Sequence, residues 1–201
     1  MATPAPETHA RPRVEGAREQ EILHATLSVL AEVGYDRLTM DAVAQRARAS
    51  KATLYRRFNG KLALVIDALV ATKGTSFLPD TGTLRGDLLA SYCAPGGLAD
   101  GSVAEVLASV VTAMTHDPEF AEAFRIQVIG PKLANTAALY RRAQARGEIR
   151  ADVDIELAAS AVAGIVLHRN VLLGEPPTPE LIARVLDDLI LPALTQRKTV
   201  K

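Results

Sequence analysis

The sequence is poor in several residue types, and each scarcity excludes a class of protein. Its one cysteine, Cys93, allows neither an internal disulfide nor a thiolate metal cage, and suits a reducing compartment. Thirteen glycines and eleven prolines in 201 residues are too few for a linker-dominated or collagen-like chain. Sustained alternation of apolar and polar residues is missing, while apolar runs rich in Ala, Leu and Val are frequent. These features predict an all-α protein.

Targeting and membrane signals are also missing. The segment Met1–Arg13 has no apolar stretch of the kind found in signal peptides. The most apolar run, Leu157–Leu167, is interrupted by His168–Asn170 and is too short to span a bilayer. We therefore expect a cytoplasmic protein with no membrane partner.

Catalytic motifs are absent from the sequence. It contains no Gly-x-Ser-x-Gly elbow, no His-Glu-x-x-His pair and no glycine-rich phosphate loop with its lysine. Gly96, Gly97 and Gly101 have neither strand nor lysine context. The expectation is a protein that is not an enzyme and uses no cofactor and no metal.

The formal net charge is zero, but the charges are unevenly distributed. Residues 1–61 hold ten basic and seven acidic side chains, and the rest of the chain has a net charge of −3. Between Arg37 and Lys61, seven basic residues face a single acidic one, Asp41. This distribution favours a polyanionic partner, although a solvated charged surface would give the same count.

Periodicity and helix-end signals divide the chain into about nine helices. We expect a disordered basic arm over 1–14, a compact helical domain over 15–61, a connecting helix over 62–73 and a larger helical bundle over 83–197. The expected helices are Glu15–Val33, Met40–Ala47, Lys51–Phe58, Lys61–Lys73, Leu84–Cys93, Ser102–Thr115, Pro118–Arg146 with a kink at Pro131, Ile155–Leu173 and Pro179–Gln196.

The segment Leu38–Phe58 has the properties of a helix-turn-helix. The second of its helices has one thin apolar edge, Leu54 and Phe58, which can dock on Val43 and Ala47. Its other residues are short, polar or basic, so this helix suits a DNA major groove better than a protein core.

The residues of this segment resemble the DNA-binding domain of the TetR family. The family pattern is matched by Gly34, Thr39, Val43, Ala44, Ala47, Ser50, Leu54, Tyr55, Phe58 and Lys61. The stretch 145–154, with Gly174–Pro176, resembles the C-terminal half of one large subgroup. Two positions depart from the pattern. Arg48 stands where the family usually has glycine, in a left-handed conformation that costs about 1 kcal/mol, and Ala52 replaces another common glycine.

The resemblance implies a role for each residue of the DNA-binding surface. Thr39, Tyr55 and Lys61 would bind phosphates, while Lys51, Thr53 and Arg56 would lie nearest base edges. Ser50 would direct a helix N-terminus at a phosphate, and Ala52 would touch a thymine methyl. Arg46 and Arg48 would add backbone contacts, and Arg11 or Arg13 would reach a minor groove. Two alternatives stay open: core packing for Tyr55 and a solvated face for Arg57.

The resemblance also implies a homodimer with a ligand cavity, in which 15–61 form the helix-turn-helix DNA-binding domain and 83–197 the ligand-binding and dimerisation domain. The two last helices would pair with their symmetry mates through Ser160, Gly164, His168, Leu186, Leu189 and Ile190, unless these residues pack within the chain. The candidate cavity residues, which could equally be core, are Tyr92, Cys93, Met114, Phe120, Phe124, Gln127 and Tyr140. The implied function is a transcriptional repressor that binds palindromic double-stranded operator DNA and is released by a small molecule. The alternative is an all-helical ligand-binding or interaction module without operator binding.

Overall fold

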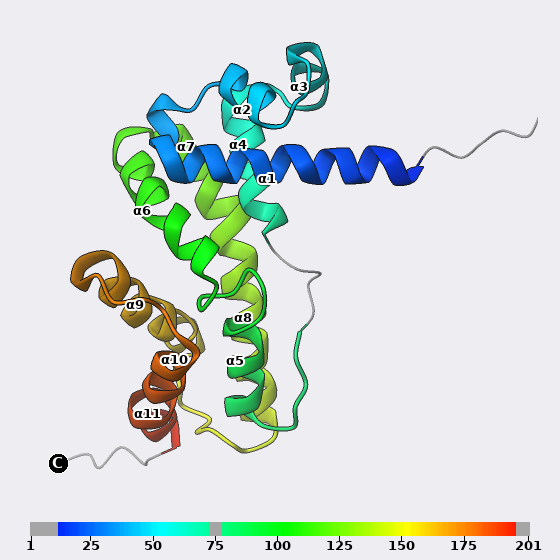
Figure 1. The fold of residues 1–201 in the computed structure, drawn as a ribbon. Coiled ribbons are helices and arrows are strands. Elements are labelled where there is room, and N and C mark those ends of the chain that lie inside the picture. Colours follow the sequence, from blue (N-terminus) through cyan, green and yellow to red (C-terminus); the bar gives the residue numbers. More distant parts are fainter. Residues whose placement is uncertain (1–11, 73–77, 196–201) are drawn as a thin grey trace, which may run out of the picture.

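The computed structural model describes residues 12–72 and 78–195, and the regular structure in these ranges is entirely helical (Figure 1). The elements are α1 (Pro12–Arg37), α2 (Met40–Arg46), α3 (Lys51–Arg57), α4 (Gly60–Ala71), α5 (Leu84–Tyr92), α6 (Gly101–His116), α7 (Pro118–Phe124), the π-helical η1 (Arg125–Ile129), α8 (Gly130–Ala145), α9 (Ile155–Leu173), α10 (Pro179–Val185), the π-helical η2 (Leu186–Ile190) and α11 (Leu191–Thr195). The segments α7–η1–α8 and α10–η2–α11 are each continuous. With each of these two continuous segments counted as one helix, the described residues form nine helices, which confirms the predicted all-α fold.

Side-chain caps set the helix starts. Thr39, Ser50, Asp117, Asp154 and Thr178 each accept a hydrogen bond from a backbone N–H in the first turn, as the sequence predicts. Three starts differ from those expected: α1 begins at Pro12 rather than Glu15, and α4 and α6 each begin one residue early, at Gly60 and Gly101. Proline suits a first helical turn, where its missing N–H has no partner to lose. The arm predicted over 1–14 therefore loses its last residues to α1, and Met1–Arg11 lie outside the described residues.

The predicted kink at Pro131 takes the form of a π-helical segment. In η1 the N–H of Gly130 donates to the carbonyl of Arg125, five residues back instead of four. Proline has no N–H to donate and its ring clashes with the preceding turn, so the helix widens just before it. The same arrangement recurs in η2, which ends two residues before Pro192.

Two separate apolar cores hold the molecule together. The first is built from α1, α2, α3, α4, α6, α7 and η1, and the second from α5, α8, α9, α10, η2 and α11. In Figure 1 the elements of the first core lie in the upper half, where α1 runs across α4, and α5, α9, α10 and α11 of the second core lie in the lower half. The core packing therefore divides the chain differently from the predicted domains, because α6 and α7 pack with the N-terminal helices.

A buried ionic cluster joins α5 to α8 in the second half. The carboxylate of Asp87 is fully buried and accepts hydrogen bonds from the backbone N–H of Thr81 (2.6 Å) and from Arg142 Nη2 (2.9 Å). Burial alone would raise the pKa of Asp87, but the hydrogen bonds from Thr81 and Arg142 outweigh it and lower that pKa. Arg146 Nη2 lies 3.4 Å from the same carboxylate, and Glu148 caps the N-terminus of α5 at the Leu84 N–H (2.6 Å). The stretch 145–154 thus has a structural role.

By length and composition alone, α9 is the one helix of the described ranges that could cross a membrane. The helix is longer than the apolar run Leu157–Leu167 suggested, because it runs unbroken through His168–Asn170 to Leu173. Its buried face is formed by Ile155, Ala159, Val162 and Val166, which pack in the second core. The rest of the helix is largely exposed in the protomer.

Candidate DNA-binding surface

The turn between α2 and α3 is fixed by its backbone. Arg48 has a φ of 51°, the left-handed conformation expected where the family pattern has glycine. The N–H of Ala49 donates to the carbonyl of Ala44 (2.8 Å), and Arg18 Nη2 of α1 donates to the carbonyl of Arg48 (2.6 Å). These bonds hold a non-glycine residue in this turn, and the turn sets the crossing of α3 over α2.

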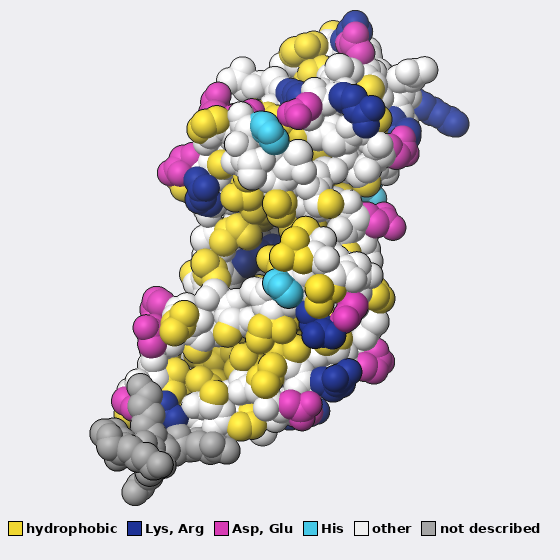
Figure 2. Space-filling model, turned by 90° about the vertical axis from the view of Figure 1, so that its left-hand side faces the viewer, with side chains coloured by type: hydrophobic (Ala, Val, Ile, Leu, Met, Phe, Trp, Pro, Cys, Tyr) yellow, Lys and Arg dark blue, Asp and Glu magenta, His cyan; other side chains and the backbone are white. Residues whose placement is uncertain are grey.

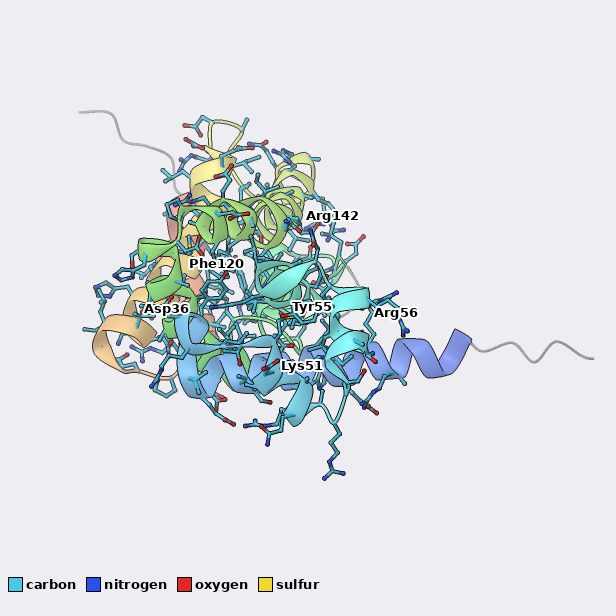
Figure 3. All side chains as sticks on the ribbon, turned by 90° about the horizontal axis from the view of Figure 1, so that it is seen from above. Asp36, Lys51, Tyr55, Arg56, Phe120 and Arg142 are labelled. Carbon is cyan, nitrogen blue, oxygen red and sulfur yellow. The ribbon has the colours of Figure 1, made fainter. Side chains whose placement is uncertain are left out.

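Only one edge of α3 is buried against the rest of the protein. Leu54 is fully buried, and Phe58, the C-cap residue of α3, is 3% exposed. Lys51, Ala52 and Arg56 are exposed, and Thr53 is half-buried. Tyr55 is 59% exposed, which excludes core packing for its side chain in the protomer. Figure 3 looks down on this end of the molecule and labels Lys51, Tyr55 and Arg56, which come from α3. An exposed polar helix on a thin apolar support can enter a major groove without unfolding its base.

The cap residues of α2 and α3 present hydroxyl groups beside helix N-termini. Thr39 Oγ1 accepts from the N–H of Ala42 (3.1 Å), and Ser50 Oγ accepts from the N–H of Thr53 (3.1 Å). The hydroxyl groups of Ser50 and Thr53 are themselves 2.8 Å apart. Both helix starts therefore carry an exposed hydroxyl where helix dipoles favour a phosphate.

Several basic side chains of this surface are paired with acidic ones. Lys51 Nζ lies 2.5 Å from Asp41 Oδ2. Arg46 binds Glu32 through two hydrogen bonds of 2.7 and 2.6 Å, and this contact lowers the pKa of Glu32. Arg57 pairs with Glu19 of α1, and its side chain remains 60% exposed, in agreement with the predicted solvated face. Within the described residues, the side chains of Arg48 and Arg56 form no ion pair. Arg56 is the α3 cation that a base edge can meet without first breaking a contact.

Lys61 stands at the start of α4, on the same end of the molecule. Its ammonium lies 4.2 Å from the centroid of the Tyr35 ring and donates to the carbonyl of Asp36 (3.2 Å). Tyr35 follows Gly34, whose φ of 76° breaks α1 and turns the next residue inward. The contact between Lys61 and Tyr35 was not foreseen from the sequence, because it joins residues 26 positions apart.

The seven candidate cavity residues are not brought together. Phe120, Phe124 and Met114 belong to the first core, Tyr92 and Tyr140 to the second, and Cys93 and Gln127 are exposed. The phenol oxygens of Tyr92 and Tyr140 are buried, and among the described residues neither forms a hydrogen bond of standard geometry, although the Thr136 hydroxyl lies close enough to that of Tyr92 to lower its pKa slightly. Burial raises the pKa of Tyr92 to about 12 and that of Tyr140 further still. Both phenols therefore stay protonated.

The residues expected at a dimer interface divide into two groups. Ser160, Gly164, His168 and Leu189 are exposed, whereas Leu186 and Ile190 are buried in the second core, where intrachain packing accounts for them. The exposed residues of α9 form a stripe with two leucines that the sequence analysis did not single out, Leu157 (69% exposed) and Leu172 (71%). Together with Gly164 and His168 they lie on one face of the helix. The sequence did not reveal this face, because most of the residues between them are also apolar.

A groove of about 280 Å³ lies beside this stripe, between α9 and the end of α11. Leu157, Ala158, Ala161, Ile190 and Leu194 line it, with Arg150 and Asp152 at its edge. The side of the molecule that carries α9 faces the viewer in Figure 2, where hydrophobic side chains gather over the lower half. A single chain thus leaves a ridge and a groove of apolar surface side by side.

Comparisons with known proteins agree with this geometry. Residues 22–68 match the family model for bacterial regulatory proteins of the tetR family, and residues 78–189 match the tetracyclin repressor-like C-terminal domain. The chain is 37% identical over 177 residues to the DNA-binding transcriptional repressor TetR of Mycobacteroides abscessus, covering 87% of this chain and 92% of that protein. It is 36% identical over 183 residues to an uncharacterised HTH-type transcriptional regulator of Mycobacterium tuberculosis, covering 89% of each. The solved TetR family transcription regulator SCO0332 superimposes with a TM-score of 0.67 at 31% identity, over 86% of this chain and 96% of that one. The chain belongs to the TetR family of DNA-binding transcriptional regulators.

Proposed function

We propose that this regulator binds a palindromic operator as a homodimer and is released from it by a small molecule. The observation that carries the DNA contact is the exposed face of α3. This face carries Tyr55 and Arg56, which forms no ion pair with the described residues, while only the opposite edge of the helix is buried. In this proposal Lys51, Thr53 and Arg56 read base edges and Ala52 contacts a thymine methyl. Thr39, Ser50, Tyr55 and Lys61 bind phosphates, and Arg48 and Arg46 add backbone contacts once Arg46 leaves Glu32. Arg11 and Arg13 lie among residues whose side chains are not described, and their minor-groove contact stays a prediction.

The test of DNA binding is selection of duplexes from a random library by the purified protein. Affinity for the selected duplex should fall steeply with salt, because phosphate contacts release counterions. Arg56→Ala should cost roughly 1–3 kcal/mol on the selected duplex and little on random DNA, whereas Lys61→Ala should weaken both about equally. Binding that is insensitive to salt, or unchanged in both variants, would favour the alternative of an interaction module without an operator.

The exposed stripe of α9 supports the homodimer. A two-fold axis near Gly164 would place the Leu157 end of one α9 beside the Leu172 end of its mate, and the small residues between would let the helices approach closely. Leu189 would add to this surface from η2, with Ser160 and His168 at its polar positions. Such a dimer covers apolar surface that a soluble monomer rarely exposes. It also supplies the two recognition helices that a palindrome requires.

The buried phenols of Tyr92 and Tyr140, which form no hydrogen bond of standard geometry among the described residues, support a ligand site in the second half. A buried hydroxyl without a hydrogen-bond partner destabilises the folded protein by about 1–3 kcal/mol. A ligand that offers a hydrogen-bond acceptor, or a bound water molecule, would remove this cost. We propose that the effector binds near Tyr92 and Tyr140 and that the protein works in the cytoplasm without catalysis. A dye-displacement screen followed by operator titration tests release. Compounds that bind but leave operator affinity unchanged would disprove induction and leave DNA binding standing.

A further inference from the structure

Lys61 is held in place before any DNA is present. Its ammonium packs on the face of the Tyr35 ring and donates to the Asp36 carbonyl, so the side chain is attached at two points. A lysine at an exposed helix start normally samples many rotamers, and that freedom is lost when it binds a phosphate. Here much of that loss occurs on folding.

Tyr35 is in turn held by the corner between α6 and α7. Its ring is buried and lies 4.4 Å, centroid to centroid, from the ring of Phe120, which is fully buried. Burial and the neighbouring carboxylate of Asp117 raise the pKa of Tyr35 to about 12, so its hydroxyl stays protonated beside that carboxylate. Asp117 also caps α7 by accepting from the N–H of Phe120 (2.9 Å), and its own N–H donates to the Ala113 carbonyl (2.8 Å) at the end of α6.

We propose that Tyr35 is a positioning residue for DNA binding, whose ring holds the Lys61 ammonium for an operator phosphate and ties it to the α6–α7 corner through Phe120. The proposal rests on the phosphate contact assigned to Lys61 above. A cation–π contact suits this role, because the ring attracts the charge without accepting all of the ammonium protons. The N–H groups remain available to a phosphate oxygen while the ring still supports them.

This arrangement gives the body of the protein a short connection to the operator. Asp117 and Phe120 belong to the segment that links α6 to the long α7–η1–α8 helix, and Tyr35 lies directly between that segment and Lys61. A displacement of the corner should move the ring, because the side chains of Tyr35 and Phe120 are both buried and their rings are in contact. The ammonium then shifts relative to the phosphate without any bending of α4.

The test uses the full-length protein and a duplex selected from a random library, with affinity measured at several salt concentrations. Tyr35→Leu removes the ring but keeps apolar volume, and Lys61→Met removes the charge. Each should weaken binding roughly two- to thirtyfold and lower the salt slope by about 0.9. The double variant should bind no more weakly than Lys61→Met alone, because the ring acts through the lysine. Tyr35→Phe keeps an aromatic ring at this position and should therefore show the salt slope of the wild type.

A purely structural effect of Tyr35→Leu is separated by two further variants. Combined with Lys51→Ala on α3, Tyr35→Leu should show additive losses, since Lys51 pairs with Asp41 and not with the ring. If Tyr35→Leu fails to fold, Phe120→Leu, which keeps the Tyr35 ring but loosens its support, should show the same non-additivity with Lys61→Met. The proposal is overturned if Tyr35→Leu keeps the wild-type affinity and slope, or if its loss adds to that of Lys61→Met. Unchanged binding by Lys61→Met would instead refute the phosphate contact itself.

Discussion

Removing the Asp41 carboxylate should strengthen DNA binding while slightly weakening the fold. In the free protomer Asp41 holds Lys51 at 2.5 Å, with the two side chains 58% and 63% exposed. An ion pair this exposed is worth about 0.2–1 kcal/mol. Lys51 must give up that contact to reach a base edge or phosphate, so Asp41→Asn should tighten operator binding about 1.4- to 5-fold.

The stability effect has the opposite sign. Asp41 lies in the first turn of α2, where a negative charge stabilises the helix by about 0.3–1 kcal/mol. Asp41→Asn should therefore lower the free energy of unfolding by a similar amount, seen as a lower urea midpoint. A variant that binds DNA more tightly yet unfolds more easily cannot be explained by a general gain in folded protein.

The assay is a fluorescence-anisotropy titration of the selected duplex at several salt concentrations. Glu105→Gln serves as the control for net charge, because Glu105 is exposed on α6, away from α3. It should change affinity much less than Asp41→Asn. The gain should vanish in the Lys51→Ala background, where no lysine is left to release. Weaker binding by Asp41→Asn, or a gain that persists without Lys51, would refute the competition between Asp41 and DNA.

Three further outcomes are expected. Gly164→Leu inserts bulk at the centre of the α9 stripe and should weaken dimerisation by about 1–3 kcal/mol. Light scattering should then show a monomer–dimer equilibrium at concentrations where the wild type is dimeric, and an undisturbed dimer would place the interface elsewhere. Asp87→Asn leaves Arg142 and Arg146 without their buried counter-charge and should cost about 3–5 kcal/mol in urea unfolding. Because the folded protein lowers the pKa of Asp87, its contribution is complete above the unfolded pKa of about 4 and is lost as the pH falls toward the lower folded value. Asp87→Asn should flatten that acid loss, and an equally steep loss would assign it to other carboxylates. Arg48→Gly relieves the left-handed residue and should raise the free energy of unfolding, measured by urea denaturation, by about 1 kcal/mol. An unchanged or lower urea midpoint would show that the turn holds Arg48 without strain.

Features with local causes were predictable from the sequence. Thr39 and Ser50 cap their helices and Arg48 adopts the left-handed turn because these outcomes depend on a few neighbouring residues. The exposed face of α3 was predictable for the same reason, since Leu54 and Phe58 leave it only one apolar edge.

Features that depend on tertiary packing were not predictable. Phe120 looked equally suited to a cavity and a core, and only the crossing of α1 with α6 and α7 decides for the core. The same holds for Leu186, because the apolar stripe of its helix did not reveal which of its residues pack within the chain. The pairing of Arg46 with Glu32, and of Lys61 with Tyr35, brings together residues from different helices, which helical periodicity does not report.

The division of the cores has a consequence for protein engineering. Val106, Val110 and Phe120 belong to the same core as the buried residues of α1 and α4, although they come from the part of the chain after residue 100. A DNA-reading unit cut out at Lys61 or Ala71 and joined to another regulator would carry unfilled holes in its interior. A transferable unit would be discontinuous, made of residues 12–72 together with 101–129, with the recipient joined at the π-helical turn before Pro131. In such exchanges, operator choice should be transferred independently of effector response only when both pieces of this unit, 12–72 and 101–129, are transferred together.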